Sequence, residues 1–463
     1  MIELHNVTIS RFGRKLFERF NLTIHPNEHW VIQGANGSGK TTLLEILLGN
    51  IHPSEGEIKY SFVHGNDWQE RYNSRQQNIH YIPAHALQVF LSGYQGLFYQ
   101  QRYYSMGDTN IPKVKDFFGA GVSRLNDMGL PPNFDIHGLM ELELTRLSNG
   151  QLKKVLILHS LAKNIPKFLL LDYPFEGLDA DSRNDLMGFI DQIAVAFKIQ
   201  MIMVDHHHEL PGVINRRLVL HDFGILSIED LKQSPLETSI EILPAKTSAQ
   251  QKNSHEPIVE LKELTIQYGK RKIIENLNWT INRGERWALT GKNGSGKTTL
   301  FSLLYADHPL AYSQQVFLFG KRRGSGESIW DIKKRINYLG PEQIHFLNPK
   351  SITVSARQYI MDQYNKNDDS LSKLIDFFDA ARFIDSPVKY LSSGQLQVML
   401  LLSFFMNDRE LLLLDEPFQF LDEQYKEKTT EYLNYYLDSN VTLVLIAHYE
   451  KDILRWTQLK MSL

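Results

Sequence analysis

Apolar residues recur along this chain at two spacings, which predict strands and helices in alternation. Residues 2–4 and 7–9 alternate between apolar and polar side chains, as a half-buried strand does. Residues 168–171 and 411–414 are apolar at every position, which is typical of a parallel strand covered on both faces. A strongly apolar helical stretch precedes each of these two runs. Buried strands that alternate with helices predict an α/β fold.

The pattern is written twice in the chain. Residues 2–4 (IEL) correspond to residues 259–261 (VEL), at an offset of 257 positions (259 − 2 = 257). Residues 79–83 (IHYIP) correspond to residues 336–340 (INYLG) at the same offset (336 − 79 = 257). Self-similarity at a fixed offset is the sequence signature of a repeated structural unit. We therefore expect two domains of the same fold in tandem.

The repeat also indicates where the domains end. The Leu-Ser pairs at 147–148 and 391–392 are 244 positions apart (391 − 147 = 244), so the first half carries 13 extra residues (257 − 244 = 13). These residues fall in an aromatic-rich stretch with few interleaved lysines or arginines, which favours the core of a small subdomain over a base-stacking surface. We expect a first domain over residues 1–226, a polar, proline-containing linker over residues 227–257 and a second domain over residues 258–463.

Composition narrows the possible function classes. Of the 463 residues 42% are hydrophobic and 22% charged, as in an ordinary globular protein. The net charge of −3 provides no general basic field, so we expect no nucleic-acid partner. The chain has no cysteine, which excludes disulfides and thiolate metal sites. Its first residues lack a signal-peptide pattern, and its longest apolar stretch is about half of a membrane span, so a role at a membrane would need a separate spanning chain.

Two glycine-rich loops carry the clearest chemistry. Residues 34–42 (GANGSGKTT) and 291–299 (GKNGSGKTT) both match G-x-x-x-x-G-K-[ST], the phosphate-binding loop, and each follows a short apolar strand. Glycines leave backbone N–H groups free to surround a polyphosphate, and the helix that follows presents its positive end to the same anion. The expected phosphate contacts are Gly34, Asn36, Gly37, Ser38, Gly39, Lys40, Thr41 and Thr42, and Gly291, Asn293, Gly294, Ser295, Gly296, Lys297, Thr298 and Thr299.

Two further features recur downstream of each loop. Residues 147–151 (LSNGQ) and 391–395 (LSSGQ) each begin an apolar helix, with a serine suited to cap it and a glycine that lets an anion approach. A plain capped helix would explain either segment taken alone. Asp172 and Asp415, however, end the fully apolar runs, where ligands bind in parallel sheets. Each carboxylate can reach an Mg²⁺ ion that is also held by Thr41 or Thr298.

This order of motifs, completed by a Leu-Asp pair and by His206 or His448, resembles the ATP-binding cassette (ABC) ATPases across essentially the whole chain outside the linker. The resemblance implies two cassettes, each with an α/β core, an antiparallel β region and a helical subdomain, that use ATP and Mg²⁺. In that family two cassettes pair head to tail, so each ATP would lie between one phosphate loop and the opposite LSxGQ segment. The second set of implied ATP contacts is Ser148, Gly150, Gln151, Ser392, Gly394 and Gln395.

The two halves differ where the resemblance places the catalytic base. The family has a glutamate directly after the strand aspartate, and the second half has Glu416 there, whereas the first half has Tyr173. A phenol with a pKa of about 10 is a poor base at neutral pH, and a positioned acid–base group contributes roughly 10²–10⁴-fold. We therefore predict that the Lys297 site hydrolyses ATP while the Lys40 site mainly holds it.

Other positions are less distinct. His206 and His448 match the family's histidine that contacts the terminal phosphate. The run of residues 205–209 (DHHHE) also permits a metal-site hypothesis, although adjacent histidines point in different directions and no second ligand group stands out. For adenine stacking, the resemblance implies Tyr268 and, with a slip of one residue, Phe12. A surface or core aromatic is an alternative for both.

One family residue is missing in both halves. The family usually has a glutamine after the strand at residues 79–82, where it contacts Mg²⁺ and relays to a permease. Here Ala84 and Pro341 stand at that point, with Gln88 and Gln343 a few residues later. The sequence leaves open whether either glutamine takes over.

The resemblance leads to three hypotheses for function. The leading one is an ATP-hydrolysing subunit, on the cytoplasmic face of a membrane, that energises an integral-membrane permease on a separate chain. Residues 316–341 resemble the second half of molybdate-importer-type double ATPase subunits, which favours an importer. The second is a soluble ribosome-associated cassette protein, although those relatives usually bear a long charged helical linker. The third is a regulatory or repair ATPase, for which neither heptads nor zinc-ligand cysteines are present.

Overall fold

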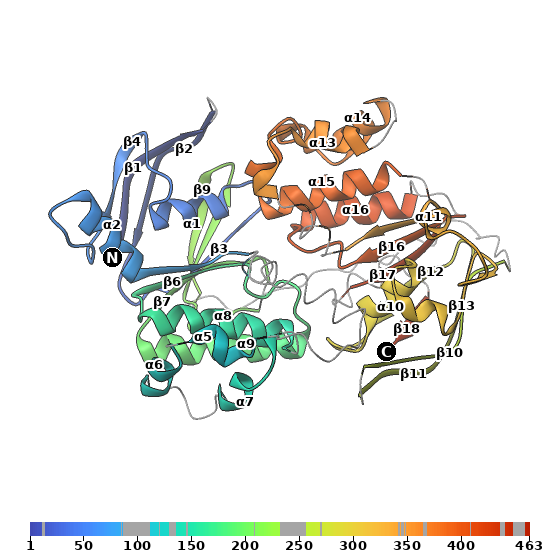
Figure 1. The fold of residues 1–463 in the computed structure, drawn as a ribbon. Helices are drawn as coiled ribbons and strands as arrows, with labels where there is room; N and C mark the ends of the chain where they lie inside the picture. Colours follow the sequence, from blue (N-terminus) through green and yellow to red (C-terminus); the bar gives the residue numbers. More distant parts are fainter. Residues whose placement is uncertain are drawn as a thin grey trace. The chain divides into compact units, whose positions relative to one another are not determined.

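The computed structural model describes most of the chain as two compact units, one up to residue 231 and one from residue 256 (Figure 1). Each unit has one mainly parallel sheet and one antiparallel sheet. The predicted fold class, α/β with two similar domains in tandem, is confirmed. The described residues are 1–11, 14–84, 86, 112–119, 121–128, 136–144, 147–207, 209–231, 256–268, 271–340, 343, 347, 349–363, 368–407, 409–435, 440–447 and 459–463.

The first unit is built on a six-stranded sheet of order β5-β6-β7-β3-β8-β9, in which only β9 runs antiparallel to its neighbour. A second sheet, β2-β1-β4, is antiparallel, with Ile2 opposite Ile24 and Leu4 opposite Leu22. The strands are β1 (Ile2–Arg11), β2 (Arg14–Ile24), β3 (Trp30–Gly34), β4 (Glu55–Tyr60), β5 (Ile79–Ile82), β6 (Phe168–Asp172), β7 (Gln200–Val204), β8 (Arg216–His221) and β9 (Gly224–Asp230).

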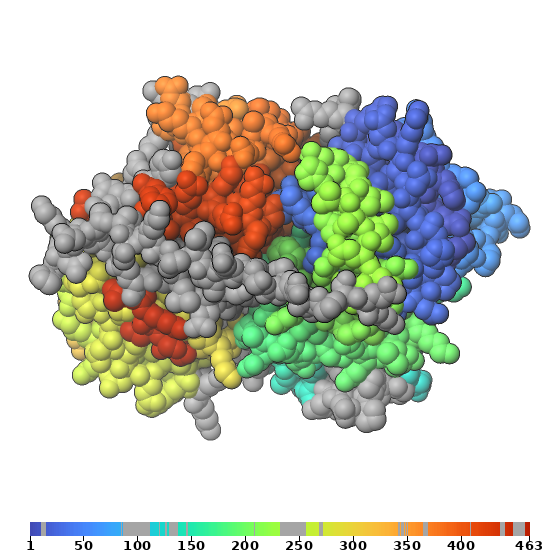
Figure 2. Space-filling model, turned by 180° about the vertical axis from the view of Figure 1, so that it is seen from behind, coloured from blue at the N-terminus to red at the C-terminus, as the bar shows by residue number. Residues whose placement is uncertain are grey.

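Helices cover both faces of the six-stranded sheet. Helix α1 lies on the face toward the antiparallel sheet, and α8 and α9 lie side by side on the other face (Figure 1). The β8–β9 hairpin, light green in Figure 2, lies against strand β2 of the same unit. The helices are α1 (Lys40–Leu48), α2 (Trp68–Asn78), α5 (Val114–Phe118), α6 (Gly121–Asp127), α7 (Ile136–Met140), α8 (Asn149–Lys163) and α9 (Ala180–Phe197).

The second unit repeats this plan. Its five-stranded sheet is entirely parallel, with the order β15-β16-β17-β12-β18, and its antiparallel sheet has the order β11-β10-β13-β14. The strands are β10 (Pro257–Tyr268), β11 (Arg271–Asn282), β12 (Arg286–Thr290), β13 (Gln315–Leu318), β14 (Lys321–Arg322), β15 (Ile336–Leu339), β16 (Leu411–Asp415), β17 (Thr442–Ile446) and β18 (Leu459–Ser462). The helices are α10 (Lys297–Leu304), α11 (Ile329–Lys333), α13 (Ala356–Gln363), α14 (Asp368–Phe377), α15 (Ser393–Phe405) and α16 (Glu423–Tyr435).

The fully apolar strand β16 explains how the second unit is held together. Successive side chains of a strand point to opposite faces. Leu411 and Leu413 accordingly pack with α10 and the antiparallel sheet, whereas Leu412 and Leu414 pack with α15 and the helices beyond it. Both faces of the sheet are therefore buried, and burial of apolar surface, at about 25 cal/mol per Å², supplies the main stabilising contribution.

The described residues test two predictions only in part: the boundary of the first domain and the aromatic subdomain core. Strand β9 runs to Asp230, so the first sheet continues past residue 226 into the expected linker. Residues 232–255 lie outside the described residues, and the domain boundaries therefore stay a proposal. Of the aromatic stretch in the first half, residues 90–111 also lie outside. Phe117 and Phe118 belong to α5 and contact His159 of α8, as expected of a small subdomain core.

Candidate nucleotide sites

The first phosphate loop connects β3 to α1 and closes around its own lysine. Lys40 is buried, and its Nζ donates to the carbonyl oxygens of Gly34 (2.7 Å) and Ala35 (2.8 Å). Gly39 caps α1 with a positive φ of 100°, and a Cβ there would lie 2.6 Å from the Phe223 ring. Only glycine is free of strain in such a position. The loop therefore holds the backbone shape that a polyphosphate needs, with the lysine at its centre.

Asp172 lies at the end of β6, where it meets the start of α1. The hydroxyl groups of Thr41 (3.2 Å) and Tyr81 (3.3 Å) both donate to its Oδ2 atom. Its Oδ1 atom is buried and has no hydrogen-bond partner. Burial raises the pKa of the Asp172 carboxyl to about 7, although the two hydroxyl groups and the charge of Lys40 oppose that rise.

These oxygens fit the metal ion that the motif implies. Mg²⁺ binds one or two protein oxygens, together with water and phosphate oxygens. The unpartnered Oδ1 of Asp172 and the hydroxyl of Thr41 are such a pair. Among the described residues, no group of three or more His, Cys, Asp or Glu side chains forms a metal site, and His208 in the histidine run lies outside them.

The second phosphate loop, between β12 and α10, repeats the first. Lys297 Nζ donates to the carbonyl oxygens of Gly291 (2.7 Å) and Lys292 (2.9 Å). Gly291 has a φ of 150°, and a Cβ at that position would lie 2.7 Å from the Ser295 hydroxyl. Asp415 is buried at the end of β16, on the same sheet edge as the loop. The parallel strands of this sheet thus bring the predicted lysine and aspartate to one edge.

Both LSxGQ segments begin a helix in the same way. Ser148 caps α8, where its Oγ accepts from the Gln151 N–H (3.2 Å) while the Gln151 side chain accepts from the Ser148 N–H (2.9 Å). Ser392 and Gln395 form the same reciprocal pair at the start of α15, at 3.3 and 3.0 Å. Such a capping box satisfies the backbone N–H groups of its two members at the positive end of the helix. Gly150 and Gly394 lie at these two helix starts.

The residues that follow the two buried aspartates have the same backbone conformation but different side chains. Tyr173 has a φ of 49° and Glu416 a φ of 53°, and each backbone N–H donates to the neighbouring strand at 2.9 Å. Glu416 accepts a hydrogen bond from the Gln419 side chain. Tyr173 is 5% exposed, and its ring centroid lies 5.0 Å from that of His206. The structure thus places the phenol where the second unit has a carboxylate.

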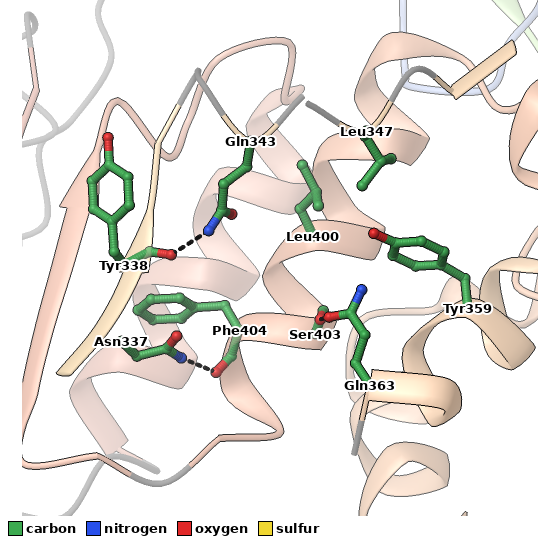
Figure 3. A pocket seen from close by; sticks show the side chains of 9 residues that line it. All are labelled: Asn337, Tyr338, Gln343, Leu347, Tyr359, Gln363, Leu400, Ser403 and Phe404. Carbon is green, nitrogen blue, oxygen red and sulfur yellow. Dashed lines mark hydrogen bonds between the residues drawn. The ribbon is translucent and has the colours of Figure 1, made fainter. Parts of the chain in front are cut away.

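Several predicted residues are not placed by the structure. Phe12 and His448 lie outside the described residues, and Tyr268 ends β10 with its side chain outside them. Their expected contacts with adenine and with the terminal phosphate stay predictions. Gln343 donates to the carbonyl of Tyr338 at 2.6 Å. It lines a cavity of about 270 Å³ beside β15, α13 and α15 (Figure 3), so its side chain is turned back toward its own strand.

Some contacts of the first site were not foreseen. Tyr81 bonds to Asp172, and its position in the apolar–polar pattern of residues 79–82 gave no sign of this role. Glu176 approaches His206, with its Oε2 atom 3.5 Å from Nε2. Lys153 of α8 donates to the carbonyl oxygens of Pro174 and Glu176. The repeat contains a signal for the Lys153 contact alone, because Lys153 corresponds to Gln397, which donates to Pro417 in the second unit.

None of the described helices combines the length and the apolar character that crossing a membrane requires.

Comparison with known sequences shows which family has this arrangement. The profile of the family described as ABC transporter matches residues 17–176 and 274–419, one match in each unit. The ABC transporter ATP-binding protein ModF of Escherichia coli is 30% identical over 463 residues, which cover 93% of this chain and 90% of ModF. An uncharacterized ABC transporter ATP-binding protein of Schizosaccharomyces pombe is 28% identical over 476 residues, which cover 98% of this chain and 95% of that protein.

Solved structures show the same fold at lower identity. A structure of ribosome-bound archaeal Pelota and ABCE1 has a TM-score of 0.58 at 20% identity, covering 98% of this chain and 74% of that one. A structure of the RNase-L inhibitor has a TM-score of 0.55 at 19% identity, covering 99% and 88%. Both profile matches contain a phosphate loop and a buried aspartate, which confirms the resemblance inferred from the motifs. The chain therefore belongs to the ABC transporter family, as an ATP-binding protein with two ATPase cassettes in tandem.

Proposed function

We propose that this protein is an asymmetric ATPase that energises a membrane permease carried on another chain, with most turnover at the Lys297 site. The observation that carries the asymmetry is the pair Tyr173 and Glu416, which share a left-handed backbone but not a carboxylate. The relationship to ModF, which is named an ABC transporter ATP-binding protein, supports the transport part. We also propose that the permease is an importer and that its cargo is a molybdate-like anion.

At the second site different residues bind the phosphates and activate the attacking water. Lys297 leaves the loop carbonyls and binds the outer phosphates, while the loop amides and the start of α10 hold the remaining charge. A bound Mg²⁺ would neutralise developing charge on the phosphates. Glu416 accepts a proton from the attacking water and orients that water toward the terminal phosphate. The Gln419 side chain, which donates to Glu416, fixes the direction of the carboxylate.

We further propose that residues of the opposite cassette complete each ATP-binding site. The starts of α8 and α15 each present the positive end of a helix, with a buried glycine in the first turn. An anion is favoured at such a helix start. Ser148, Gly150 and Gln151 would then contact the ATP on Lys297, and Ser392, Gly394 and Gln395 the ATP on Lys40. ATP binding would draw the cassettes together, and hydrolysis would release them.

Exchange of single side chains tests the asymmetry. Glu416→Gln keeps the shape of the side chain and removes the base, so we expect steady-state ATP turnover to fall by about 10²-fold or more. Tyr173→Phe removes only a hydroxyl group and is expected to leave turnover within about twofold, because a phenol is a poor base at neutral pH. Phosphate release by the full-length variants is the measurement. Equal losses in the two variants would contradict the proposal.

A second candidate function follows from the solved relatives. The structure with Pelota is of a ribosome-bound complex, and another similar structure pairs an archaeal ribosome recycling factor with a ribosomal stalk protein. At 17–20% identity these structures show the fold, so a ribosomal role is the weaker candidate. Copurification of the Glu416→Gln variant in ATP distinguishes the two, since this variant would hold the closed state. Recovery of a protein with several apolar spans supports the permease, and recovery of ribosomal RNA supports the alternative.

A further inference from the structure

The first unit has kept a carboxylate near its catalytic position, displaced along the chain. Positions 172–179 (DYPFEGLD) and 415–422 (DEPFQFLD) align without a gap. The second unit has Glu416 followed three residues later by Gln419, and these two side chains are hydrogen-bonded. The first unit has Tyr173 followed three residues later by Glu176. The carboxylate and its neutral neighbour have therefore exchanged positions.

The displaced carboxylate is directed at a histidine. Glu176 Oε2 lies 3.5 Å from His206 Nε2, and the two side chains are only 11% and 17% exposed. The ring of Tyr173 contacts the same histidine in a tilted arrangement, with 5.0 Å between the ring centroids. A buried carboxylate is costly unless it is paired, so the pairing with His206 accounts for where Glu176 lies. His206 is thus contacted by both residues that stand in the places of Glu416 and Gln419.

A lysine from the LSNGQ helix fixes this arrangement. Lys153 Nζ donates to the carbonyl oxygens of Pro174 (2.7 Å) and Glu176 (2.6 Å). In the second unit the matching Gln397 donates to the Pro417 carbonyl, at 2.8 Å. Hydrogen bonds from a charged donor are roughly twice as strong as neutral ones. The backbone that carries Glu176 is therefore held at two points rather than left as a free loop.

We propose that Glu176 is a positioning residue for His206, and that the pair gives the Lys40 site a slow ATP hydrolysis of its own. With the Nε2 proton directed at Glu176, the lone pair of the neutral imidazole is on Nδ1. The attacking water transfers a proton to Nδ1 as its oxygen bonds to the γ-phosphorus, and the bond from that phosphorus to the ADP oxygen breaks. The Glu176 carboxylate stays ionised, stabilises the imidazolium, and the proton then leaves with inorganic phosphate.

This inference rests on the proposed function, because it requires ATP at the Lys40 site. It also changes the interpretation of Tyr173. The first site would hydrolyse ATP slowly with a different base, rather than lack a base. Asp205 and His207 flank His206 along the chain, and Arg183 of α9 adds a positive charge nearby. The effect of Glu176 is therefore tested by substituting it directly, while these groups stay unchanged.

The experiment uses the full-length chain with Glu416→Gln, in which turnover at the second site is expected to be lower by about 10²-fold or more. We expect a small residual kcat in this background. Adding Glu176→Gln should lower that kcat by about tenfold or more with KM for ATP changed less than about twofold, as loss of an oriented acid–base group predicts. Glu176→Asp should restore part of the kcat. Asp181→Asn, which removes an exposed carboxylate at the start of α9, is the matched control and should change neither constant.

The possible outcomes separate this inference from the proposed function. Equal kcat with and without Glu176→Gln would overturn the role of Glu176, as would a Glu416→Gln protein that binds ATP but has no residual turnover. Neither result affects the second site. A wild-type protein without ATP turnover, or a Glu416→Gln variant with the wild-type rate, would instead contradict the proposed function. If Glu176→Gln fails to fold, His206→Asn is measured in the Glu416→Gln chain instead. An unchanged kcat overturns the proposal, and a lowered kcat at constant KM supports it.

Discussion

Asp172 shows how one buried side chain links proton binding to metal binding. Burial raises its pKa from 3.8 to about 7, so the folded protein keeps a proton that the unfolded chain has already lost. Between these two values the folded state binds more protons, and the free energy of unfolding therefore falls as the pH rises. A metal ligand must be deprotonated, so Mg²⁺ has to displace this proton.

We therefore expect the first site to bind Mg²⁺ more weakly at pH 6 than at pH 8. Below a pH of about 7 the apparent affinity of the site for Mg²⁺ with ATP should rise roughly tenfold per pH unit, and it should level off above that value. Isothermal titration with the Glu416→Gln/Lys297→Ala variant, in which binding at the second site is weakened, measures the first site. Asp172→Asn removes the titrating group and should flatten the curve. An equally steep curve in Asp172→Asn would contradict the assignment.

At the level of residues, the sequence predicted the parts that local rules determine. The two loops and the capping serines adopt the geometry expected from their motifs, because glycine conformation and helix capping depend on a few neighbouring residues. Lys40 and Lys297 donate to carbonyl oxygens of their own loops, and their contacts with phosphate stay predictions. The contact of Glu176 with His206 was not foreseen. It depends on how two segments that follow different strands approach each other, and no spacing rule encodes that approach.

At the level of elements, Glu410 joins two borders of the second unit's sheet. The residue precedes β16 and accepts from Arg335, which precedes β15, and from Arg283, which lies between β11 and β12. The two guanidinium groups lower the pKa of the Glu410 carboxyl to about 2. A depressed pKa contributes stability above the unfolded value of 4.5, and this contribution is lost as the pH falls toward 2.

Glu410→Gln should therefore lower the free energy of unfolding of the protein by about 1–2 kcal/mol at pH 7. The difference from wild type should shrink as the pH falls from 4.5 toward 2, where both side chains are neutral. Chemical denaturation followed by circular dichroism measures it. Glu431→Gln, an exposed residue of α16, is the control and should stay within about 0.5 kcal/mol of wild type. A difference that does not change with pH would exclude the ion pairs as its cause.

The elements themselves were predictable where the apolar pattern was continuous. Strands β6 and β16 occupy the two fully apolar runs, and both are buried at every residue, because side chains on each face meet a layer of helices or strands. Strand β9 was partly assigned to the linker. It exposes Ile225, Leu226 and Ile228 at the edge of its sheet and is held by pairing with β8, and such an edge strand lacks the clean alternation that would identify it.

At the level of the whole molecule, the repeat predicted two similar units, but the sequence does not determine how two folded units meet. In the proposed composite sites that relation depends on ATP. The absence of native cysteines allows it to be measured, because two introduced thiols are labelled without competition. Val195 in the first unit and Tyr435 in the second are both exposed, at 72% and 61%, and neither belongs to a candidate site.

We expect Val195→Cys/Tyr435→Cys, placed in the Glu416→Gln chain and labelled with a fluorescent donor and acceptor, to change its transfer efficiency when ATP and Mg²⁺ are added. The change should reverse when nucleotide is removed, since in the proposed composite sites each triphosphate contacts both cassettes. The same labels in a chain with Ser392→Arg and Ser148→Arg are the control, because bulky side chains at the starts of α8 and α15 would block the opposite phosphates. A signal that ATP leaves unaltered would argue against composite sites.

The hydrogen bonds of Lys153 and Gln397, which connect the LSxGQ helices to the loops after Asp172 and Asp415, predict coupling between the two ATP sites. Gln397 joins α15 to the carbonyl directly after Glu416, and Lys153 joins α8 to the loop between Tyr173 and Glu176. Each helix would sense one nucleotide while it is fastened to the catalytic loop of the other. Occupancy of one site should then alter the rate at its neighbour, so ATP dependence of turnover should be sigmoidal, and Gln397→Ala should make it hyperbolic.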